Sequence, residues 1–501
     1  MGIALSPQIH PQVADFLEKP RKMLINGQWV NAASGKTFPT YNPATGEILV
    51  QVAEGDREDI ERAVKAARKA FDQGPWRQMT AAERARLIWK LADLIDAHTE
   101  ELGYIESLDN GKPLAVAKAA DVPLAAELFR YMAGWATKIE GNTIPLSVPY
   151  TPGAKYLAYT LREPVGVVGQ VIPWNFPLLM AAWKLGPALA TGCTVVLKPA
   201  EQTPLSALRL GELIVEAGFP EGVVNIVPGY GETAGAALAA HPDVDKIAFT
   251  GSTEVGKLIV HAAAGNLKKV SLELGGKSPN VVFKDADIDA AIAGSASAIF
   301  FNHGQCCCAG SRLYVEKAIY DRVVEGVAEQ AKKIQVGSGL DPQTQMGPLV
   351  SEEQMNRVCG YLEAGFSEGA TALAGGHKSG GKGYFVEPTV LVNTREDMKV
   401  VKEEIFGPVV TAMPFDDPEE ILPRANDSAY GLAAAVWTRD ISKAHRMAEQ
   451  LRAGTVWINC YNIFDAALPF GGYKQSGWGR EMGHDVLNLY TQTKAICARL
   501  A

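Results

Sequence analysis

The stretch CTVVLKPAEQTPLSALRLGELIVEAGFPEGVVNIVPG, from Cys193 to Gly229, contains the pattern that decides the fold. Two short apolar runs rich in valine, VVLK and VVNIV, enclose a segment whose apolar residues recur every three or four positions. Short buried strands joined through an amphipathic helix are typical of a parallel sheet. The stretch therefore predicts a βαβ unit.

The same alternation extends along most of the chain. The runs VGVVGQVIP and DKIAFTG flank this unit, and the pattern restarts after a Gly/Pro-rich joint, residues 274–279, with NVVF, RLYVE and TVWINC. Residues 57–136 instead show helical periodicity, with Asp56 and Thr80 as expected N-caps. We therefore expect an α/β protein with two parallel-sheet domains.

Two further segments follow neither rhythm. IPLSVPYTPGAKYLAYTLREP alternates like a hairpin, and LYTQTKAICARL near the C-terminus alternates like an edge strand. Because exposed strand edges invite pairing with another chain, we expect a small β oligomerisation element from residues 142–164 and 476–501. The first domain would then cover residues 1–141 and 165–276, and the second residues 277–475.

Composition excludes several classes of partner. The chain of 501 residues carries a net charge of −8 and has no basic run, so neither nucleic acid nor an anionic membrane is expected to bind it. Lys184, Gly186 and Pro187 interrupt the longest apolar stretch, which argues against a membrane span. Residues 1–20 lack the pattern of a secretory signal, so we expect a cytoplasmic protein.

Two motifs are candidates for nucleotide binding. In DKIAFTGSTEVG, Gly251 and Ser252 precede a helix whose free N–H groups could bind a phosphate, although a tight turn also needs glycine. In VVLKPAEQTP, Lys198 and Glu201 follow a strand end, where they could hold ribose hydroxyls or form a solvated loop. The glycines of PGYGETAG, Gly231 among them, could line a nucleotide or form only a turn.

Two polar residues are candidates for acid–base and electrostatic catalysis. Asn175, in VIPWNFP, could donate its amide hydrogens to an oxyanion, or serve ordinary turn chemistry between prolines. Glu273, in SLELGGKSP, ends an apolar strand, where burial would raise the pKa of its carboxyl toward that of a general base. It could equally be a solvent-facing strand residue.

The run FNHGQCCCAGSR places three cysteines side by side. Adjacent thiolates cannot occupy the corners of one zinc tetrahedron, and no CxxC or paired-His motif completes a metal site. Seven cysteines in a large chain without a secretory signal favour reduced thiols. In an extended segment Cys306 and Cys308 face one way and Cys307 the other. A nucleophile and a set of inert core thiols both remain open at this point.

The motifs WNFP, KPAEQTP, FTGSTEVG, LELGGKSP, GQCCCAG, EEIFGPV and PFGGYKQSG, in this order, resemble the NAD(P)-dependent aldehyde dehydrogenase superfamily. The resemblance covers roughly Leu24 to Lys494 and is highly specific because the motifs are numerous and ordered. It implies a Rossmann-like cofactor domain, a catalytic α/β domain and a homotetramer built as a dimer of dimers. Two segments also resemble bacterial phenylacetaldehyde dehydrogenases.

The resemblance implies a role for each matching position. Cys307 is implied as the nucleophile, Glu273 as the general base and Asn175 as the oxyanion donor, with Lys184 assisting proton transfer. The implied cofactor is NAD, with no metal. Its expected contacts are the adenine-ribose pair Lys198 and Glu201, the pyrophosphate contacts Gly251 and Ser252, the nicotinamide contacts Glu404 and Phe406, and in addition Trp174 and Gly231.

The substrate implied is an apolar or aromatic aldehyde, such as phenylacetaldehyde, that becomes a carboxylic acid. The expected channel is walled mainly by aromatic side chains, namely Phe176, Met180, Trp183, Phe464 and Phe470. Asn462 and Asp465 are polar exceptions. Two alternatives are a CoA-acylating dehydrogenase, which needs no general base, and a non-catalytic relative used for its fold. Glu201 favours NAD over NADP because a carboxylate repels a 2′-phosphate.

Overall fold

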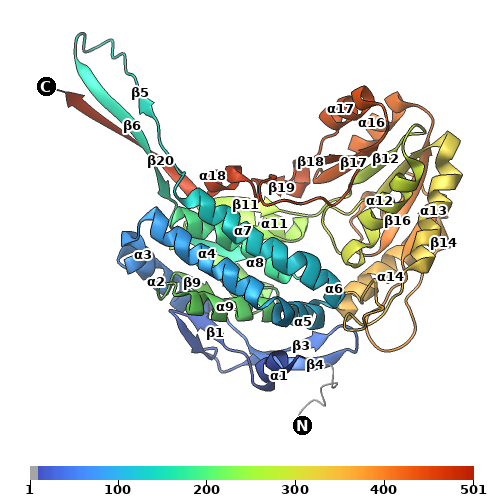
Figure 1. Ribbon diagram of the computed structural model, residues 1–501, viewed down its shortest axis with the longest axis horizontal. Coiled ribbons are helices and arrows are strands. Elements are labelled where there is room, and N and C mark those ends of the chain that lie inside the picture. Colours follow the sequence, from blue (N-terminus) through green and yellow to red (C-terminus); the bar gives the residue numbers. More distant parts are fainter. Residues whose placement is uncertain (1–9, 501) are drawn as a thin grey trace.

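The computed structural model describes residues 10–500. Residues 1–9 lie outside the described residues. They are the first part of residues 1–20, the stretch that was compared with a secretory signal. Two sheets with helices on their faces form the body of the molecule, and a β arm projects from it (Figure 1). The expected α/β architecture is confirmed.

The first sheet has eight strands in the order β19-β11-β10-β7-β8-β9-β1-β2. Its parallel centre contains the predicted βαβ unit, in which β8 (Thr194–Lys198) and β9 (Val224–Ile226) are joined through α9 (Leu205–Ala217). The remaining strands are β7 (Val167–Val171), β10 (Lys246–Thr250) and β11 (Lys269–Glu273), with antiparallel β1 (Met23–Ile25), β2 (Gln28–Val30) and β19 (Gly477–Trp478) at the edges.

Helices from the N-terminal third pack around this sheet. Asp56 and Thr80 are the N-caps of their helices, as the sequence predicts, and each also forms a reciprocal capping box. The helices and flanking strands are α1 (Pro11–Glu18), β3 (Thr37–Asn42), β4 (Glu47–Ala53), α2 (Arg57–Asp72), α3 (Pro75–Gln78), α4 (Ala81–Ala97), α5 (Thr99–Asn110), α6 (Leu114–Val116), the π-helix Ala117–Asp121, α7 (Val122–Ala136) and α8 (Pro177–Thr191). Helices α4, α7 and α8 pack side by side (Figure 1).

The second sheet has seven strands in the order β14-β15-β16-β13-β12-β17-β18. Its strands are β12 (Pro279–Val282), β13 (Arg312–Glu316), β14 (Thr371–Ala374), β15 (Thr389–Val392), β16 (Val409–Phe415), β17 (Ala433–Trp437) and β18 (Thr455–Ile458). All are parallel except β14. Its helices include α12 (Ile288–Phe300), α13 (Tyr320–Lys333), α14 (Glu352–Ser367), α15 (Lys399–Lys402), α16 (Pro418–Asn426) and α17 (Ile441–Gln450).

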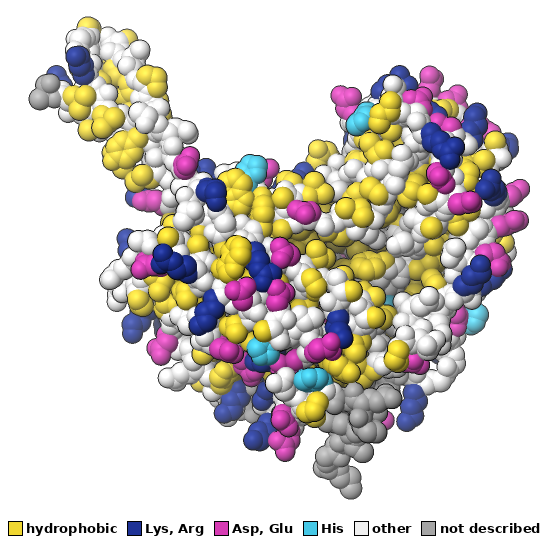
Figure 2. Space-filling model, in the orientation of Figure 1, with side chains coloured by type: hydrophobic (Ala, Val, Ile, Leu, Met, Phe, Trp, Pro, Cys, Tyr) yellow, Lys and Arg dark blue, Asp and Glu magenta, His cyan; other side chains and the backbone are white. Residues whose placement is uncertain are grey.

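The arm is a three-stranded antiparallel sheet of β5 (Thr143–Ile144), β6 (Lys155–Pro164) and β20 (Thr491–Leu500). The expected hairpin and C-terminal edge strand are both present in it. Large apolar side chains are exposed along the arm, namely Ile144, Leu146, Tyr150, Leu157, Leu161 and Leu500 (Figure 2). Gly477 and Trp478, which were expected to belong with this element, instead pair with β11 in the first sheet.

One buried apolar cluster joins both sheets. It includes Val168 and Leu197 from the first sheet, and Leu313 and Ala435 from the second. The short elements π-helix Gly231–Gly235, α10 (Ala236–Ala240), α11 (Thr253–Ala263) and α18 (Leu487–Tyr490) complete the first body. Among residues 10–500, no helix is both long and apolar enough to cross a bilayer.

Candidate active site

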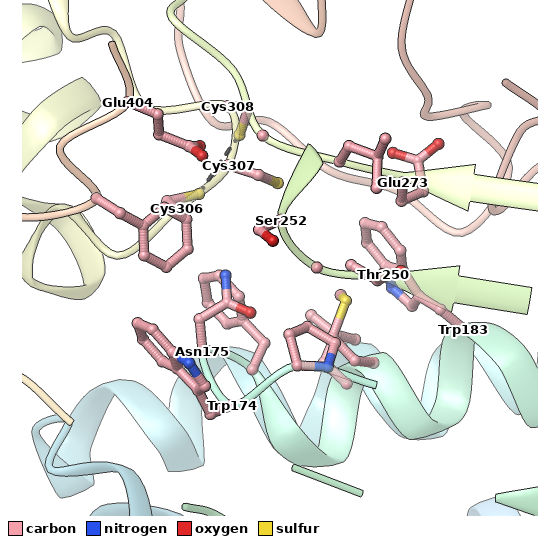
Figure 3. A pocket seen from close by; sticks show the side chains of 18 of the residues that line it. Trp174, Asn175, Trp183, Thr250, Ser252, Glu273, Cys306, Cys307, Cys308 and Glu404 are labelled. Carbon is pink, nitrogen blue, oxygen red and sulfur yellow. Dashed lines mark hydrogen bonds between the residues drawn. The ribbon is translucent and has the colours of Figure 1, made fainter. Parts of the chain in front are cut away.

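A cavity of about 340 Å³ lies between the two sheets. Residues that follow β7, β10 and β11 form one wall, and the loop after α12 forms the opposite wall (Figure 3). Carboxyl ends of parallel strands are where α/β proteins place their ligands. Cys307, Asn175 and Glu273 all line this cavity, so the structure brings three of the four expected catalytic side chains together.

A left-handed turn aims the cysteine run at the cavity. After α12 ends at Phe300, Asn302, His303 and Gly304 have φ values of 49°, 59° and 67°. A Cβ on Gly304 would lie 2.0 Å from the carbonyl oxygen of Gly407, so only glycine fits at this position. The turn ends the helix and leaves Cys307 partly exposed on the cavity side.

The three cysteines differ in surroundings, although the run forms a turn and not the extended segment that was considered. Cys306 and Cys308 are buried, and their sulfur atoms are 3.4 Å apart. The Tyr461 hydroxyl donates to the carbonyl oxygen of Cys308 at 2.7 Å and fixes this end of the run. Figure 3 shows the Cys307 sulfur pointing away from this pair and into the cavity.

The surroundings of the Cys307 thiol disfavour its ionised form and raise its pKa. Its interaction with Cys306, its burial and the nearby Glu273 carboxylate raise its pKa well above the usual value of a thiol. Because the thiolate is the nucleophilic form, reactivity at neutral pH requires a base or a positive charge brought into the cavity.

Asn175 lies in the loop between β7 and α8 and is 5% exposed. Its side-chain Nδ2 donates to the carbonyl oxygen of Gln305, two residues before Cys307, at 3.1 Å. An amide nitrogen carries two hydrogens, so this bond leaves the second one free. In Figure 3 the amide nitrogen points toward the cysteine run.

Glu273 ends β11 and is 4% exposed. Neither of its carboxyl oxygens has a hydrogen-bond partner within residues 10–500. Burial, and next the charge of Glu481, raise its pKa well above the ordinary value, while Lys184 and Arg480 oppose the shift. A carboxyl group with a raised pKa and free oxygens is suited to take a proton from water near neutral pH.

Lys184 lies behind this wall. Its Nζ forms a buried ion pair with Glu481 Oε1 at 2.7 Å, and within the described chain it does not line the cavity. The side chain therefore acts on Glu273 through the electrostatic field and through Glu481.

The nucleotide motifs lie at neighbouring strand ends. Ser252 is the N-cap of α11, where its hydroxyl accepts from the N–H of Val255 at 3.2 Å, and both Ser252 and Gly251 line the cavity. Lys198, at the end of β8, pairs with Glu201 at 2.9 Å. Three expected cofactor contacts are not among the described residues that line the cavity, namely Lys198, Glu201 and Gly231. They lie at or beyond the ends of the neighbouring strands β8 and β9.

Glu404 and Phe406 reach the same cavity from the second body. Glu404 Oε1 accepts from the N–H of Gly276 at 2.9 Å, and burial raises its pKa to about 7. Phe406 has φ 58° and packs edge-on against Trp174, with 5.1 Å between ring centroids. The expected nicotinamide contacts thus line the same cavity as the cysteine run.

The far end of the cavity has aromatic walls. Trp183 and Phe464 each pack against Phe470, with ring centroids 5.4 and 5.7 Å apart, and Phe176 stacks with Phe301 at 6.0 Å. All five residues of the expected channel line the cavity, namely Phe176, Met180, Trp183, Phe464 and Phe470.

Comparisons with known proteins identify the family. The model of the Aldehyde dehydrogenase family matches residues 29–496. The chain belongs to the aldehyde dehydrogenase family. A solved NAD+ complex of an aldehyde dehydrogenase from Bacillus cereus is 56% identical, with a TM-score of 0.96 over 98% of this chain and 99% of that chain.

Curated relatives of this aldehyde dehydrogenase are similar over nearly the full length. The mitochondrial aldehyde dehydrogenase of Rattus norvegicus is 54% identical over 481 residues, which is 96% of this chain and 92% of the relative. The mitochondrial benzaldehyde dehydrogenase of Antirrhinum majus is 52% identical over 498 residues, which is 99% of this chain and 92% of the relative.

Sequence reasoning missed several residues that line the cavity of this aldehyde dehydrogenase. Gln354 and Arg357 enter it from α14, where Gln354 Nε2 donates to the carbonyl oxygen of Phe406 at 2.7 Å. Phe301 and Leu124 extend its apolar wall. Gln354 and Arg357 are three positions apart and so share one face of a helix, which is a weak indication of a site. Ordinary surface helices also have a polar face, so this spacing does not distinguish a site from a solvent-exposed surface. Within residues 10–500, no group of three His, Cys, Asp or Glu side chains could hold a metal ion.

Proposed function

We propose that this aldehyde dehydrogenase oxidises apolar and aromatic aldehydes to carboxylic acids with NAD, using Cys307 as the nucleophile. The observation that carries the proposal is one cavity with a thiol, an amide donor and a buried carboxyl group at one end and aromatic walls at the other. The benzaldehyde dehydrogenase among the relatives supports an aromatic substrate. Phenylacetaldehyde is the specific substrate that we propose.

The residues fit a dinucleotide. The N-terminus of α11 carries Gly251 and Ser252, where free N–H groups favour a pyrophosphate. Lys198 and Glu201 would hold the adenine ribose, and Glu404 with Phe406 would hold the nicotinamide end. Thr250 Oγ1, buried at the same strand end, has no hydrogen-bond partner among residues 10–500 and offers a further polar contact. When bound, NAD accepts the hydride that leaves the substrate carbon.

Cys307 carries the first step. Its sulfur, once its proton has passed to water, attacks the carbonyl carbon of the aldehyde, and the carbonyl oxygen becomes an oxyanion. The free Nδ2 hydrogen of Asn175 and the backbone N–H of Cys307 donate to this oxyanion. Loss of hydride from the same carbon then leaves a thioester on Cys307.

Glu273 carries the second step. It removes a proton from a water molecule, which attacks the thioester and releases the carboxylic acid with the Cys307 thiol. The raised pKa of Glu273 makes its ionised form a stronger base than an ordinary glutamate, although a smaller fraction is ionised at a given pH. A CoA-acylating enzyme would not need such a base, so the buried free carboxyl of Glu273 favours hydrolysis.

The test is NAD reduction by the purified protein with phenylacetaldehyde, benzaldehyde and hexanal, with NADP and with coenzyme A in parallel. We expect NADH formation without coenzyme A, and a higher kcat/KM for the aromatic aldehydes. Cys307→Ala is the control for non-enzymatic reduction. NADH formation that depends on coenzyme A, or none with any aldehyde, would contradict the proposed function.

We also propose that the chain assembles as a homotetramer, a dimer of dimers, in the cytoplasm. Its domain division follows the sequence, except that Gly477 and Trp478 belong to the first sheet. The apolar side chains on the arm support the assembly, because exposed patches of this kind mark protein interfaces. Light scattering after size exclusion measures the assembly directly. Leu157→Glu with Leu161→Glu on β6 should reduce the mass per particle, and an unchanged mass would contradict the role of the arm.

A further inference from the structure

We propose that Asn302 is a positioning residue that fixes the Asn175 amide at its working distance from Cys307. This inference rests on the proposed function and goes beyond it, because Asn302 contacts neither substrate nor cofactor in that scheme. It holds together two loops from different sheets, and the oxyanion site lies between those loops.

The hydrogen bonds of the Asn302 side chain carry the proposal. Its Nδ2 donates to the carbonyl oxygen of Asn175 at 3.0 Å and to the carbonyl oxygen of Gln305 at 3.1 Å. Asn175 Nδ2 donates to the same carbonyl of Gln305 at 3.1 Å. The two amide groups and the two carbonyls form a closed ring between the Asn175 loop and the cysteine run. Both amide hydrogens of Asn302 are used in it.

This ring decides which way the Asn175 amide faces. Since Gln305 offers a carbonyl, Asn175 must present its nitrogen and not its oxygen to the cysteine run. One Nδ2 hydrogen is then held by Gln305, and the other is left for a substrate oxyanion. If the Gln305 carbonyl moved, the Asn175 amide would lose the bond that sets its rotation.

Other donors do not replace Asn302. The Asn175 carbonyl also accepts from Lys112 Nζ at 3.3 Å and from Asn110 Nδ2 at 3.4 Å. Both bonds are longer, and both donors lie on the side of the Asn175 loop. Among residues 10–500, Asn302, two residues beyond α12, is the donor to this carbonyl that comes from the side of the cysteine run.

The backbone explains why asparagine suits this position. Asn302 has φ 49° and ψ 38°, a left-handed conformation that Asn adopts more readily than most residues. The side chain is 6% exposed, and its Oδ1 has no partner within residues 10–500. A buried carbonyl without a partner costs stability. The position therefore bears a cost that a purely structural turn would avoid with glycine.

The test separates positioning from folding by comparing Asn302→Gly in the wild-type and Asn175→Ala backgrounds. Glycine keeps the left-handed turn and removes only the amide. In the wild type we expect kcat/KM for phenylacetaldehyde to fall roughly 10- to 100-fold, part of what loss of an oxyanion donor costs. In the Asn175→Ala background we expect a further loss below about 3-fold, because coupled residues are non-additive.

Two controls accompany this cycle. Asn393→Gly removes a left-handed asparagine, φ 56°, from an exposed turn and should leave activity unchanged. Asn302→Asp retains the shape but replaces the donors by acceptors, so it should lose at least as much activity as Asn302→Gly. If Asn302→Gly fails to fold, Asn302→Asp takes its place in the comparison of the two backgrounds. NAD binding, followed by protein fluorescence, should change little in either Asn302 variant.

The outcomes are distinct. Equal losses in both backgrounds, or full activity of Asn302→Gly, would overturn the positioning role while the proposed function stands. Full activity of Asn175→Ala would overturn both the oxyanion role of Asn175 and the inference. A wild-type protein that oxidises no aldehyde would refute the proposed function itself.

Discussion

The two sheets position their residues of the candidate active site in different ways. The eight-stranded sheet presents Glu273 as the last residue of a buried strand and Ser252 as the cap of a helix that follows directly. The seven-stranded sheet presents Cys307 on a loop that turns through three left-handed residues. Strand-end residues are held by the core itself. The nucleophile is held by a few side-chain hydrogen bonds, so its position depends on particular residues.

A second contrast lies within the cysteine run. Cys306 and Cys308 face each other in the core, whereas Cys307 faces the cavity. Three chemically equal groups thus have different surroundings, because the run forms a turn in which the N–H of Ala309 donates to the carbonyl oxygen of Cys306. The paired thiols of Cys306 and Cys308 are inert in the proposed reaction although they belong to the same turn.

The largest expected effect is that of Cys307→Ala, which should reduce aldehyde oxidation below detection because it removes the thiol that points into the cavity (Figure 3). Steady-state NADH formation measures it. Cys306→Ala and Cys308→Ala are matched controls and should retain substantial activity, with at most a few °C lost in Tm from the small cavities they create. Substantial activity in Cys307→Ala would remove the nucleophile from the proposed mechanism.

The sequence predicts the first sheet's contribution well. Lys198, Gly251 and Glu273 each follow a short β-branched run at the point where a strand ends, and the structure places all three at strand ends. This works because strand ends on one edge of a parallel sheet come together whatever the loops do.

The sequence predicts loops and uniformly buried helices less well. Nothing local indicates that His303 takes a left-handed conformation or that Asn302 links two loops, because both depend on contacts distant in sequence. Lys184 was expected at the active site, but every residue of α8 is buried, so its periodicity does not reveal which face meets the cavity. The pairing of Gly477 with β11 likewise has no local signal.

Glu273→Gln tests the strand-end side of the comparison and should slow turnover by about 10²- to 10⁴-fold through loss of the general base. Acylation precedes this loss, so rapid mixing should still show a burst of NADH. The exposed Glu325→Gln is the control. A correctly folded variant that turns over slowly without a burst would contradict the division of roles between Cys307 and Glu273.

The pH dependence follows from the same group. Because the pKa of Glu273 is raised, its carboxyl is protonated, and inactive as a base, over a wider pH range than an ordinary glutamate. The rate of thioester hydrolysis should therefore rise with pH as Glu273 ionises and fall as pH drops through its raised pKa. Single-turnover rates measured as a function of pH test this dependence. The rise of the rate with pH should be absent in Glu273→Gln. If the rise persists in that variant, it comes from the ionisation of another group.

Asn175→Ala should have the next effect, a loss of about 10²- to 10³-fold in kcat, as expected for one preorganised oxyanion donor. The nucleophile and the base remain, so activity should persist at this lower level. Stopped-flow measurement should place the loss in the burst phase, since the oxyanion forms before hydride leaves. A loss confined to hydrolysis would show that Asn175 acts on the thioester alone.

The smallest expected effect is that of Glu201→Gln, at the strand end farthest from the reaction. Its carboxylate, partly exposed and paired with Lys198 at 2.9 Å, would repel the 2′-phosphate of NADP. The neutral amide removes this repulsion and frees Lys198 to meet a phosphate. The ratio of kcat/KM for NAD to that for NADP should fall roughly 5- to 20-fold, with little change in kcat. Glu216→Gln, on the exposed face of α9, is the matched control and should leave the ratio unchanged. If the ratio is the same in both variants, the cofactor preference is set elsewhere than at this strand end.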